Sequence, residues 1–150
     1  MADRILFKGK NSPLSNLFIL EDGLVLKGIL FNASEQAYQW EKCMLYQNFN
    51  IAQTILREKN PYEQMRLGGL AKGTKEQEKT WLKLFYMSEI LKIKLINSTA
   101  YRKSLKQSKD KILIEDTNHE FWGRGKTGRG KNNLGVLHCI LRARSKICEN

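Results

Sequence analysis

The sequence has no apolar run approaching the roughly 20 residues that span a bilayer, which argues against an integral membrane protein. Its first seven residues are too few and too interrupted by charge to form a secretory signal peptide. It has no internal repeat, low-complexity tract or linker, so collagen-like and disordered classes are excluded. Its 150 residues, 41% of them hydrophobic, suffice for one self-supporting domain over residues 1–150, which we expect to be cytoplasmic.

Cysteine and histidine are too sparse for a disulfide framework or a zinc site. The three cysteines, Cys43, Cys139 and Cys148, include no C-x-x-C pair. The two histidines, His119 and His138, do not stand at zinc-finger spacing from them. We therefore expect buried, reduced thiols, and neither a metal nor another cofactor.

Acidic residues are also few. There are 15 of them against 26 lysines and arginines, which gives a net charge of +11. This excess favours encounter with polyanions, such as nucleic acid, nucleotides or an anionic membrane surface. An ordinary solvated lysine surface explains the charge equally well, so the charge alone does not choose a partner.

Strand-like segments come first and helical segments later, a pattern typical of an α+β fold rather than of alternating β-α-β units. The Asp22–Gly23 pair predicts a hairpin turn between residues 18–20 and 24–26. Further strands are expected at residues 4–8, 29–31 and 112–114. The polar segments at residues 104–111 and 117–132 are expected to be loops.

Helix-start signals divide the rest of the chain. Asn32 or Ser34 is expected to cap the first helix, and Thr74 begins a capping-box pattern. The helix after Thr74 is expected to bury one face made of Trp81, Leu84, Phe85, Leu91 and Leu95. Other helices are expected at residues 51–59, at 61–69, after 98–99, and from 133 with Leu134, Leu137, Ile140 and Leu141 inward.

Two overlapping glycine patterns lie near the C-terminus. Residues 123–128 match G-x-G-x-x-G, and residues 125–131 match G-x-x-x-x-G-K. Too little chain follows for a dinucleotide-binding fold, and Asn132 stands where a P-loop needs serine or threonine. A basic glycine-rich loop that runs into a helix N-terminus still suits an anion, because backbone N–H groups and the helix dipole favour a phosphate. The alternative is a flexible surface loop.

A polar stripe marks the first predicted helix. Glu35, Tyr38, Gln39 and Lys42 stand at i, i+3, i+4 and i+7, so they share one face. A carboxylate, a phenol, an amide and an amine in one row indicate a catalytic or ligand-orienting face. The alternative is an ordinary exposed helix face.

Tryptophans stand beside polar segments. Trp122 directly precedes the glycine loop and follows Asp116 and Glu120, and a tryptophan in such a loop is suited to stacking a planar base. Trp81 also fits the inward face of its predicted helix. The histidines have no nucleophile partner that the sequence can place, and we interpret both as ordinary histidines.

Read together, these segments resemble one family. The resemblance lies in residues 12–18 (SPLSNLF), residues 31–39 (FNASEQAYQ) with Lys42, Trp81, residues 121–125 (FWGRG), and residues 130–135 (GKNNLG) with Arg142. The order and content of these motifs are similar to those of the NADAR family, which includes the YbiA-like N-glycosidases. The resemblance spans residues ~5 to ~144 and covers nearly the whole chain.

The resemblance implies a mainly helical α+β domain with a small N-terminal antiparallel sheet, no metal, and hydrolysis of the bond between a ribosyl C1′ and a nitrogen. Glu35 and Lys42 align with the family's motif glutamate and lysine, and Trp81 and Trp122 with its pocket tryptophans. As a hypothesis, Glu35 stabilises positive charge at C1′ or activates water, and the helix dipole keeps it ionised. The acid that assists the leaving nitrogen is Asp116 or Glu120, if burial raises its pKa.

Lys42 offers a second route, in which its amine forms a Schiff base with the opened sugar. The remaining candidate residues are expected to contact the substrate. Base and ribose contacts are expected from Asn16, Tyr38, Gln39, Trp81, Trp122, Gly123, Gly125 and Asn132. Phosphate contacts are expected from Arg124, Lys126, Arg129 and Lys131. We expect the Glu35–Lys42 face and Trp122 to enclose a sugar.

Three interpretations of the function are open. The positive charge favours removal of ADP-ribose from guanine in nucleic acid, with the basic surface contacting the polymer. The second is hydrolysis of phosphoribosylamino-pyrimidine intermediates of riboflavin biosynthesis, which the family also implies. The third, from another class, is a non-catalytic nucleotide- or nucleic-acid-binding module that needs the basic loop and not Glu35. No membrane partner is expected, and the sequence predicts no oligomeric state.

Overall fold

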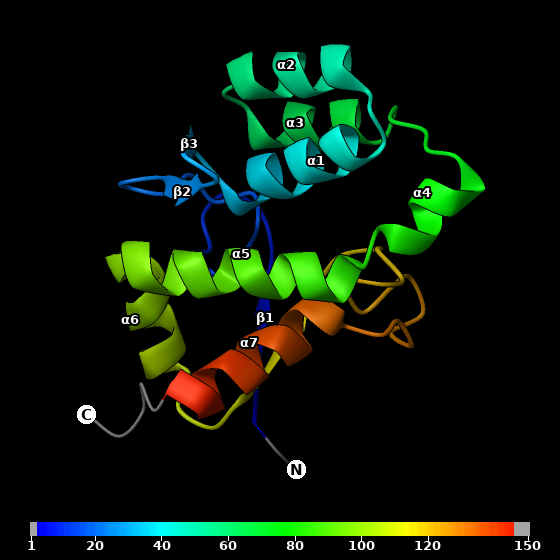
Figure 1. The fold of residues 1–150 in the computed structure, drawn as a ribbon. Coiled ribbons are helices and arrows are strands. Elements are labelled where there is room, and N and C mark those ends of the chain that lie inside the picture. Colours follow the sequence, from blue (N-terminus) through cyan, green and yellow to red (C-terminus); the bar gives the residue numbers. More distant parts are fainter. Residues whose placement is uncertain (1–2, 146–150) are drawn as a thin grey trace. The chain divides into compact units, whose positions relative to one another are not determined.

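Helices make up most of the regular structure in the computed structural model, which describes residues 3–145 (Figure 1). The expected fold class is confirmed, because the chain is mainly helical and carries a small antiparallel sheet near its N-terminus. The chain divides into a middle unit, Asn16–Ser98, and a terminal unit that combines Met1–Ser15 with Thr99–Asn150. The single domain over residues 1–150 stays a prediction.

The antiparallel sheet of the middle unit is a hairpin of β2 (Leu24–Leu26) and β3 (Ile29–Phe31). Its turn is Lys27–Gly28, where both residues have positive φ, at 53° and 79°. A two-residue turn of this kind matches the twist of the two strands. The predicted hairpin of residues 18–20 and 24–26 is therefore wrong, because the second strand follows residue 26 and does not precede residue 22.

Five helices complete the middle unit. They are α1 (Ser34–Leu45), α2 (Phe49–Arg57), α3 (Pro61–Gly68), α4 (Lys75–Thr80) and α5 (Lys83–Asn97). Two predicted helix starts are confirmed. Asn60 accepts a hydrogen bond from the Tyr62 N–H ahead of α3, and Thr74 forms both halves of a capping box with Gln77. The predicted cap of α1 is wrong, because Ala33 holds that position without a side-chain bond.

The long helix predicted after Thr74 is interrupted. Trp81 and Leu82 each have a ψ of 86°, which ends α4 and lets α5 begin in a new direction. The predicted inner face is consequently wrong in its first turn, where Leu84 and Phe85 are 45% and 56% exposed. Farther along, α5 buries Met87, Ile90, Leu91 and Lys94.

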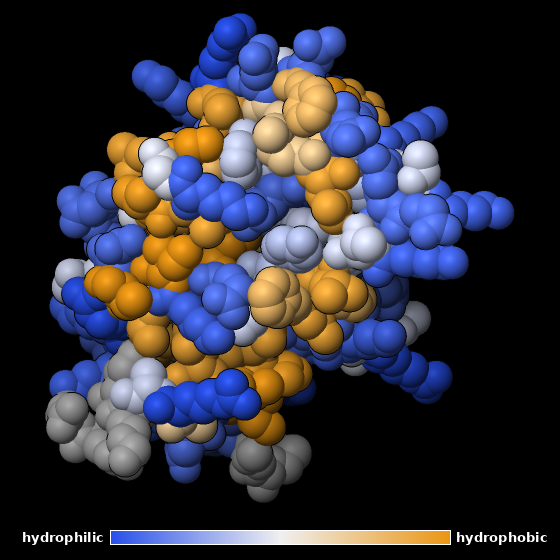
Figure 2. All heavy atoms as spheres, viewed as in Figure 1, coloured by the Kyte–Doolittle hydropathy of each residue, from blue (hydrophilic) through white to orange (hydrophobic). Residues whose placement is uncertain are grey.

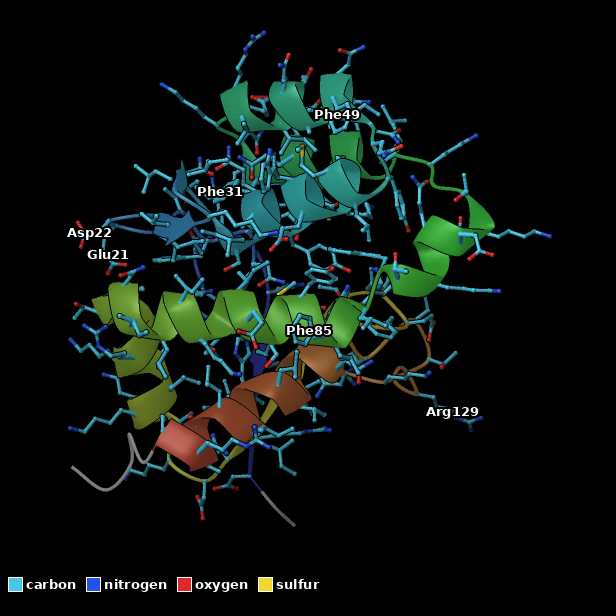
Figure 3. The ribbon with its side chains drawn as sticks, in the orientation of Figure 1. Glu21, Asp22, Phe31, Phe49, Phe85 and Arg129 are labelled. Carbon is cyan, nitrogen blue, oxygen red and sulfur yellow. The ribbon has the colours of Figure 1, made fainter. Side chains whose placement is uncertain are left out.

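The core of the middle unit lies where α1 packs against α2, α3 and α5. Most of α1 is buried, including its polar residues. Phe31 at the end of β3 is fully buried, and its ring centre lies 5.5 Å from that of Trp40 (Figure 3). Apolar side chains also reach the surface, in several patches separated by polar side chains (Figure 2).

The terminal unit contains a second, parallel pair of strands. In it β1 (Arg4–Phe7) pairs with β4 (Ile112–Glu115), and α6 (Thr99–Gln107) and α7 (Asn133–Ser145) are its helices. The predicted loop at residues 104–111 is wrong in its first half, because α6 continues to residue 107. In α7, Leu134 is buried as expected, whereas Ile140 is 43% exposed.

Buried His138 takes an inward position on α7. Its Nε2 lies 2.7 Å from the Leu14 carbonyl oxygen, and its Nδ1 lies 2.6 Å from the Tyr101 hydroxyl. A carbonyl only accepts, so Nε2 carries the proton and Nδ1 accepts the tyrosine hydroxyl hydrogen. This network joins α6, α7 and the segment before residue 15, and it agrees with a structural role for His138.

Of the three thiols, Cys43 is free and buried, as expected. Cys139 is free and only half-buried, and Cys148 lies outside the described residues. Within residues 3–145, no helix combines the length and the apolar character needed to cross a bilayer.

Candidate functional site

The polar stripe of α1 is buried, so the interpretation of an exposed helix face is wrong. Glu35, Tyr38 and Gln39 are 7%, 5% and 7% exposed, and Lys42 is half-buried. Ionisable and amide groups are rarely buried unless they are paired or have a function. The sequence spacing placed these residues on one face, and α1 packs against α2, α3 and α5.

Glu35 is held both at its backbone and at its carboxylate. Its backbone N–H donates to the Asn16 carbonyl oxygen at 3.1 Å, at the first turn of α1. The Gln39 Nε2 donates to Glu35 Oε1 at 2.8 Å, one turn along the helix. The helix N-terminus adds a partial positive charge that favours a carboxylate there. Glu35 is therefore fixed in orientation inside the middle unit.

Lys42 has an altered electrostatic environment. Burial lowers the pKa of its amine from the ordinary value of 10.5, and the positive charge of Lys83 lowers the pKa further. Cys43 and Glu35 act in the opposite direction, but burial dominates. The neutral amine, which is the nucleophilic form, is therefore more populated near neutral pH than in a surface lysine.

Aromatic rings form one wall of this cluster. Tyr38 and Trp81 have ring centres 5.0 Å apart, and Tyr86 stacks on Trp81 at 4.5 Å with an interplanar angle of 24°. Trp81 is 6% exposed and ends α4. It lies against Tyr38 of the α1 stripe.

Several buried polar atoms of the middle unit have no hydrogen-bond partner among the described residues. They are Asn16 Oδ1, Ser34 Oγ, Gln39 Oε1, Gln64 Oε1 and Trp81 Nε1. Each such atom costs about 1–3 kcal/mol of folding free energy when left unsatisfied. They come from α1 (Ser34 and Gln39), α3 (Gln64), the segment before β2 (Asn16) and the end of α4 (Trp81), and they indicate where water or a ligand completes the bonding. Asn16, Gln39 and Trp81 are three of the residues that the sequence predicted to bind substrate.

Sequence reasoning missed Gly68, which stands behind Gln39. A Cβ atom at Gly68 would collide with the Gln39 side chain at Cγ, Cδ and Oε1. Gly68 is the last residue of α3 and is buried. The glycine therefore makes room for the amide that orients Glu35. A Gly-Gly pair at a helix end is typical of a helix stop, and no sequence pattern indicated this second role of Gly68.

The glycine loop of the terminal unit is closed on its own backbone. The N–H groups of Gly123, Arg124, Gly125 and Gly130 donate to the carbonyl oxygens of His119, Glu115, Thr117 and Arg124, respectively. At the start of α7, the N–H groups of Asn133 and Leu134 donate to the carbonyl oxygens of Phe121 and Trp122. The expected cradle of backbone N–H groups for a phosphate is therefore wrong at these positions.

The glycines of this loop serve its packing. A Cβ atom at Gly123 would collide with Thr117 and Glu115, and one at Gly125 would collide with the Glu120 carboxylate. Gly125 also has a φ of 72°, which glycine adopts without strain. These contacts explain Gly123 and Gly125 without a substrate.

Asn132 has a structural role in the loop. Its Oδ1 accepts from the Glu115 N–H at 2.8 Å, and its Nδ2 donates to the Leu113 carbonyl oxygen at 2.9 Å. Both ends of the amide thus bind the backbone of β4. The expected contact between Asn132 and a substrate has no support in this geometry.

The two acids named from the sequence, Asp116 and Glu120, are not buried, and their role as the acid for the leaving nitrogen stays a prediction. Glu120 is exposed, and Asp116 is partly exposed with an oxygen 3.6 Å from Arg124 Nη1. Glu115 is the carboxyl group whose pKa is raised, because burial disfavours its charge and outweighs a hydrogen bond from Thr117. Strand alternation places Glu115 on the same side of β4 as buried Leu113, and this signal could have identified it.

The remaining predicted residues of the loop lie at its surface. Trp122 is half-buried and meets Phe121 edge-on, with ring centres 4.7 Å apart. Lys126, Arg129 and Lys131 are exposed, and Figure 3 shows the Arg129 side chain extending away from the loop. Their side chains, rather than the backbone, are what this loop offers to an anion.

Comparison with known proteins gives three findings. The sequence model of the NADAR domain matches residues 6–147. Protein irg-1 of Caenorhabditis elegans is 40% identical over 69 residues, which cover 46% of this chain and only 32% of the worm protein. The NMR structure of E. coli YbiA matches with a TM-score of 0.78 and 24% identity, over 99% of this chain and 88% of that one. This structural similarity shows a shared fold.

Proposed function

The chain belongs to the NADAR family, and on that premise we propose that it hydrolyses the bond between a ribosyl C1′ atom and a nitrogen. The family is associated with N-glycosidase activity. The observation that carries the proposal is the buried and incompletely bonded polar cluster around α1. An oriented carboxylate, an amine with a lowered pKa and an aromatic wall lie together there.

Glu35 would drive the hydrolytic route. As the C1′–N bond breaks, positive charge develops on the sugar, and the Glu35 carboxylate stabilises that charge. The same carboxylate takes a proton from the attacking water, whose oxygen bonds to C1′. Glu35 then passes this proton to the departing nitrogen, so the products are the free sugar and the free base. The Gln39 amide holds Glu35 in place for this reaction, at a distance of 2.8 Å.

Lys42 would drive the alternative route. The ribosyl group opens to an imine between C1′ and the nitrogen of the base, and the neutral Lys42 amine adds to C1′. The base nitrogen leaves with a proton, and a Schiff base links C1′ to Lys42 until water hydrolyses it. The lowered pKa of Lys42 supports this route, because it supplies the neutral amine.

Unsatisfied polar atoms and rings would bind the ribosylated base. Trp81 Nε1 can donate, and Asn16 Oδ1 and Gln39 Oε1 can accept, so the cluster offers both kinds of hydrogen bond. Tyr38 and Trp81 supply ring surface. A site built to bond polar groups discriminates strongly against analogues that lack them, because its own atoms then stay unpaired.

For the substrate, we propose ADP-ribose attached to guanine in nucleic acid. The net charge of +11 supports this choice over a small phosphoribosyl metabolite, which carries a single phosphate. Lys126, Arg129 and Lys131 are exposed and suited to a phosphodiester backbone. Greater activity on a phosphoribosylamino-pyrimidine than on ADP-ribosylated oligonucleotide, at both low and moderate salt, would reverse this choice.

The test is release of ADP-ribose from an oligonucleotide that carries one ADP-ribosylated guanine, followed by mass spectrometry. Glu35→Gln should lower kcat about 100-fold or more, because removing a general base costs 10²–10⁴-fold. Glu41→Gln is the matched control, since Glu41 is also 7% exposed on α1 but pairs with Lys27 at 3.1 Å. Equal activity of the Glu35→Gln variant and the wild type would show a non-catalytic protein or another reacting group.

Borohydride trapping separates the two routes. On the Lys42 route, reduction during turnover should add the mass of the sugar to the peptide that contains Lys42. On the Glu35 route, no adduct forms. Lys42→Arg, which keeps the charge but not the nucleophile, should abolish both the adduct and turnover if the lysine route operates.

A further inference from the structure

A series of aromatic rings leads from the buried cluster of the middle unit to its surface. Tyr38 and Trp81 are 5% and 6% exposed, Tyr86 is half-buried, and Phe85 is 56% exposed. Consecutive ring centres are 5.0, 4.5 and 5.5 Å apart. Phe85 lies in the first turn of α5 (Figure 3). The break between α4 and α5 creates this arrangement, because it turns Phe85 outward.

Two exposed lysines precede Phe85, the exposed end of the ring series. Lys83 is exposed two residues before Phe85, and it lies near enough to Lys42 to lower the pKa of that amine. Lys79 is exposed in the last turn of α4, two residues before Trp81. Phe85 is thus a large exposed aromatic ring that follows two exposed lysines along the chain. Aromatic rings beside basic groups are the arrangement that binds unpaired bases and their phosphates.

We propose that Phe85 is a stacking platform for the nucleotide next to the ribosylated base in a single-stranded nucleic acid, with Lys79 and Lys83 at the intervening phosphates. This inference rests on the proposed function and adds where the flanking strand binds. In the proposed function, Trp81 Nε1, which has no hydrogen-bond partner among the described residues, donates to the target base. From there the rings continue outward, with Tyr86 stacked on Trp81 and Phe85 edge-on to Tyr86 at an interplanar angle of 83°, and a flanking base would stack on the exposed Phe85 ring.

The nucleic-acid strand that flanks the modified nucleotide is then part of the substrate. A free ADP-ribosylated guanosine has no neighbouring base and would leave Phe85 uncovered. An oligonucleotide would cover it and gain the stacking contribution. Phe85 therefore determines preference for polymer over monomer and does not touch the reacting atoms.

The experiment compares Phe85→Ala with the wild type on both substrates. The kcat/KM for an ADP-ribosylated single-stranded DNA oligonucleotide should fall roughly 10- to 100-fold through KM, as expected for one lost base stack. The kcat/KM for free ADP-ribosylated guanosine should stay unchanged. Phe85→Trp should restore the oligonucleotide rate. Ile96→Ala is the control, since Ile96 is 75% exposed on the same helix and outside the ring series.

Binding of an unmodified single-stranded DNA oligonucleotide, measured by fluorescence anisotropy, separates this proposal from the proposed function. Weaker binding by Phe85→Ala than by Ile96→Ala supports the platform even if no substrate is hydrolysed. Equal binding by both variants overturns it, even if the enzyme is active. A dimer of the wild type that Phe85→Ala dissociates, with unchanged DNA binding, also overturns it in favour of contact between two copies of the chain.

Discussion

Lys94 makes the stability of this protein depend on pH in a predictable direction. It is fully buried on α5, and burial lowers the pKa of its amine from 10.5 to about 7, although the Glu21 carboxylate acts to raise the pKa. Glu21 in turn accepts a hydrogen bond from Ser98 Oγ at 2.6 Å. Figure 3 shows Glu21 beside Asp22, ahead of the β2–β3 hairpin. The charged form of Lys94 is therefore disfavoured in the folded protein.

The sign follows from proton binding in the two states. Between pH 7 and 10.5 the unfolded chain holds a proton on Lys94 and the folded protein does not, so the free energy of unfolding rises with pH. Below pH 7 both states hold the proton and the full destabilisation is present. From pH 7 to pH 9 the gain is about 2 kcal/mol, at 1.36 kcal/mol per pH unit where the slope is full. For a chain of this size that gain raises Tm by roughly 5 °C.

Urea unfolding at pH 7, 8 and 9 measures the effect. Lys94→Met should remove most of the rise in stability and leave the contribution of Lys42, whose pKa is also lowered. Lys92→Met should keep the full rise, because Lys92 is an exposed lysine of the same helix paired with Glu89. The same increase in the Lys94→Met variant as in the wild type would show that another group causes the pH dependence and that Lys94 is not desolvated as described.

Three further outcomes follow from the packing. Gly68→Ala should displace the Gln39 amide from Glu35 and lower kcat at least 10-fold at small cost in Tm, and full activity would show that Gln39 does not position Glu35. Tyr101→Phe should reduce the free energy of unfolding by about 1–3 kcal/mol, measured in urea, because His138 Nδ1 loses its donor, and no change would contradict the buried network. If the lysine route operates, kcat should rise with pH through a pKa below 10.5, since only the neutral Lys42 amine attacks, and a flat profile above pH 6 would exclude Lys42 as the nucleophile.

Features of the fold that depend on neighbouring residues in the sequence were predictable. The Asn60–Pro61 start of α3 and the Thr74 capping box satisfy backbone N–H groups within one turn, so the local sequence determines them. The parallel pairing of β1 with β4 joins segments more than 100 residues apart, and no local pattern encodes it. The break at Trp81 and Leu82 also lacked a signal, because neither glycine nor proline marks it.

The candidate site was predictable in its residue types and not in its bonding. Helical spacing placed Glu35, Gln39 and Lys42 on one face, but only the packing shows that this face is buried. The reverse happened at the glycine loop, where the pattern predicted free backbone N–H groups and the structure uses them internally. Asn132 illustrates the reason. An asparagine whose amide binds the backbone of its own loop cannot be distinguished in the sequence from one that binds a ligand.

The most direct test is a crystal structure of the Glu35→Gln protein with an oligonucleotide that carries one ADP-ribosylated guanine. The ribosyl C1′ should lie within about 3.5 Å of the side chain at position 35, the distance of a reactive geometry. Trp81 Nε1 and Asn16 Oδ1 should each bond the bound molecule. Density for the modified nucleotide elsewhere, with both atoms still unpaired, would contradict a hydrolase site on α1.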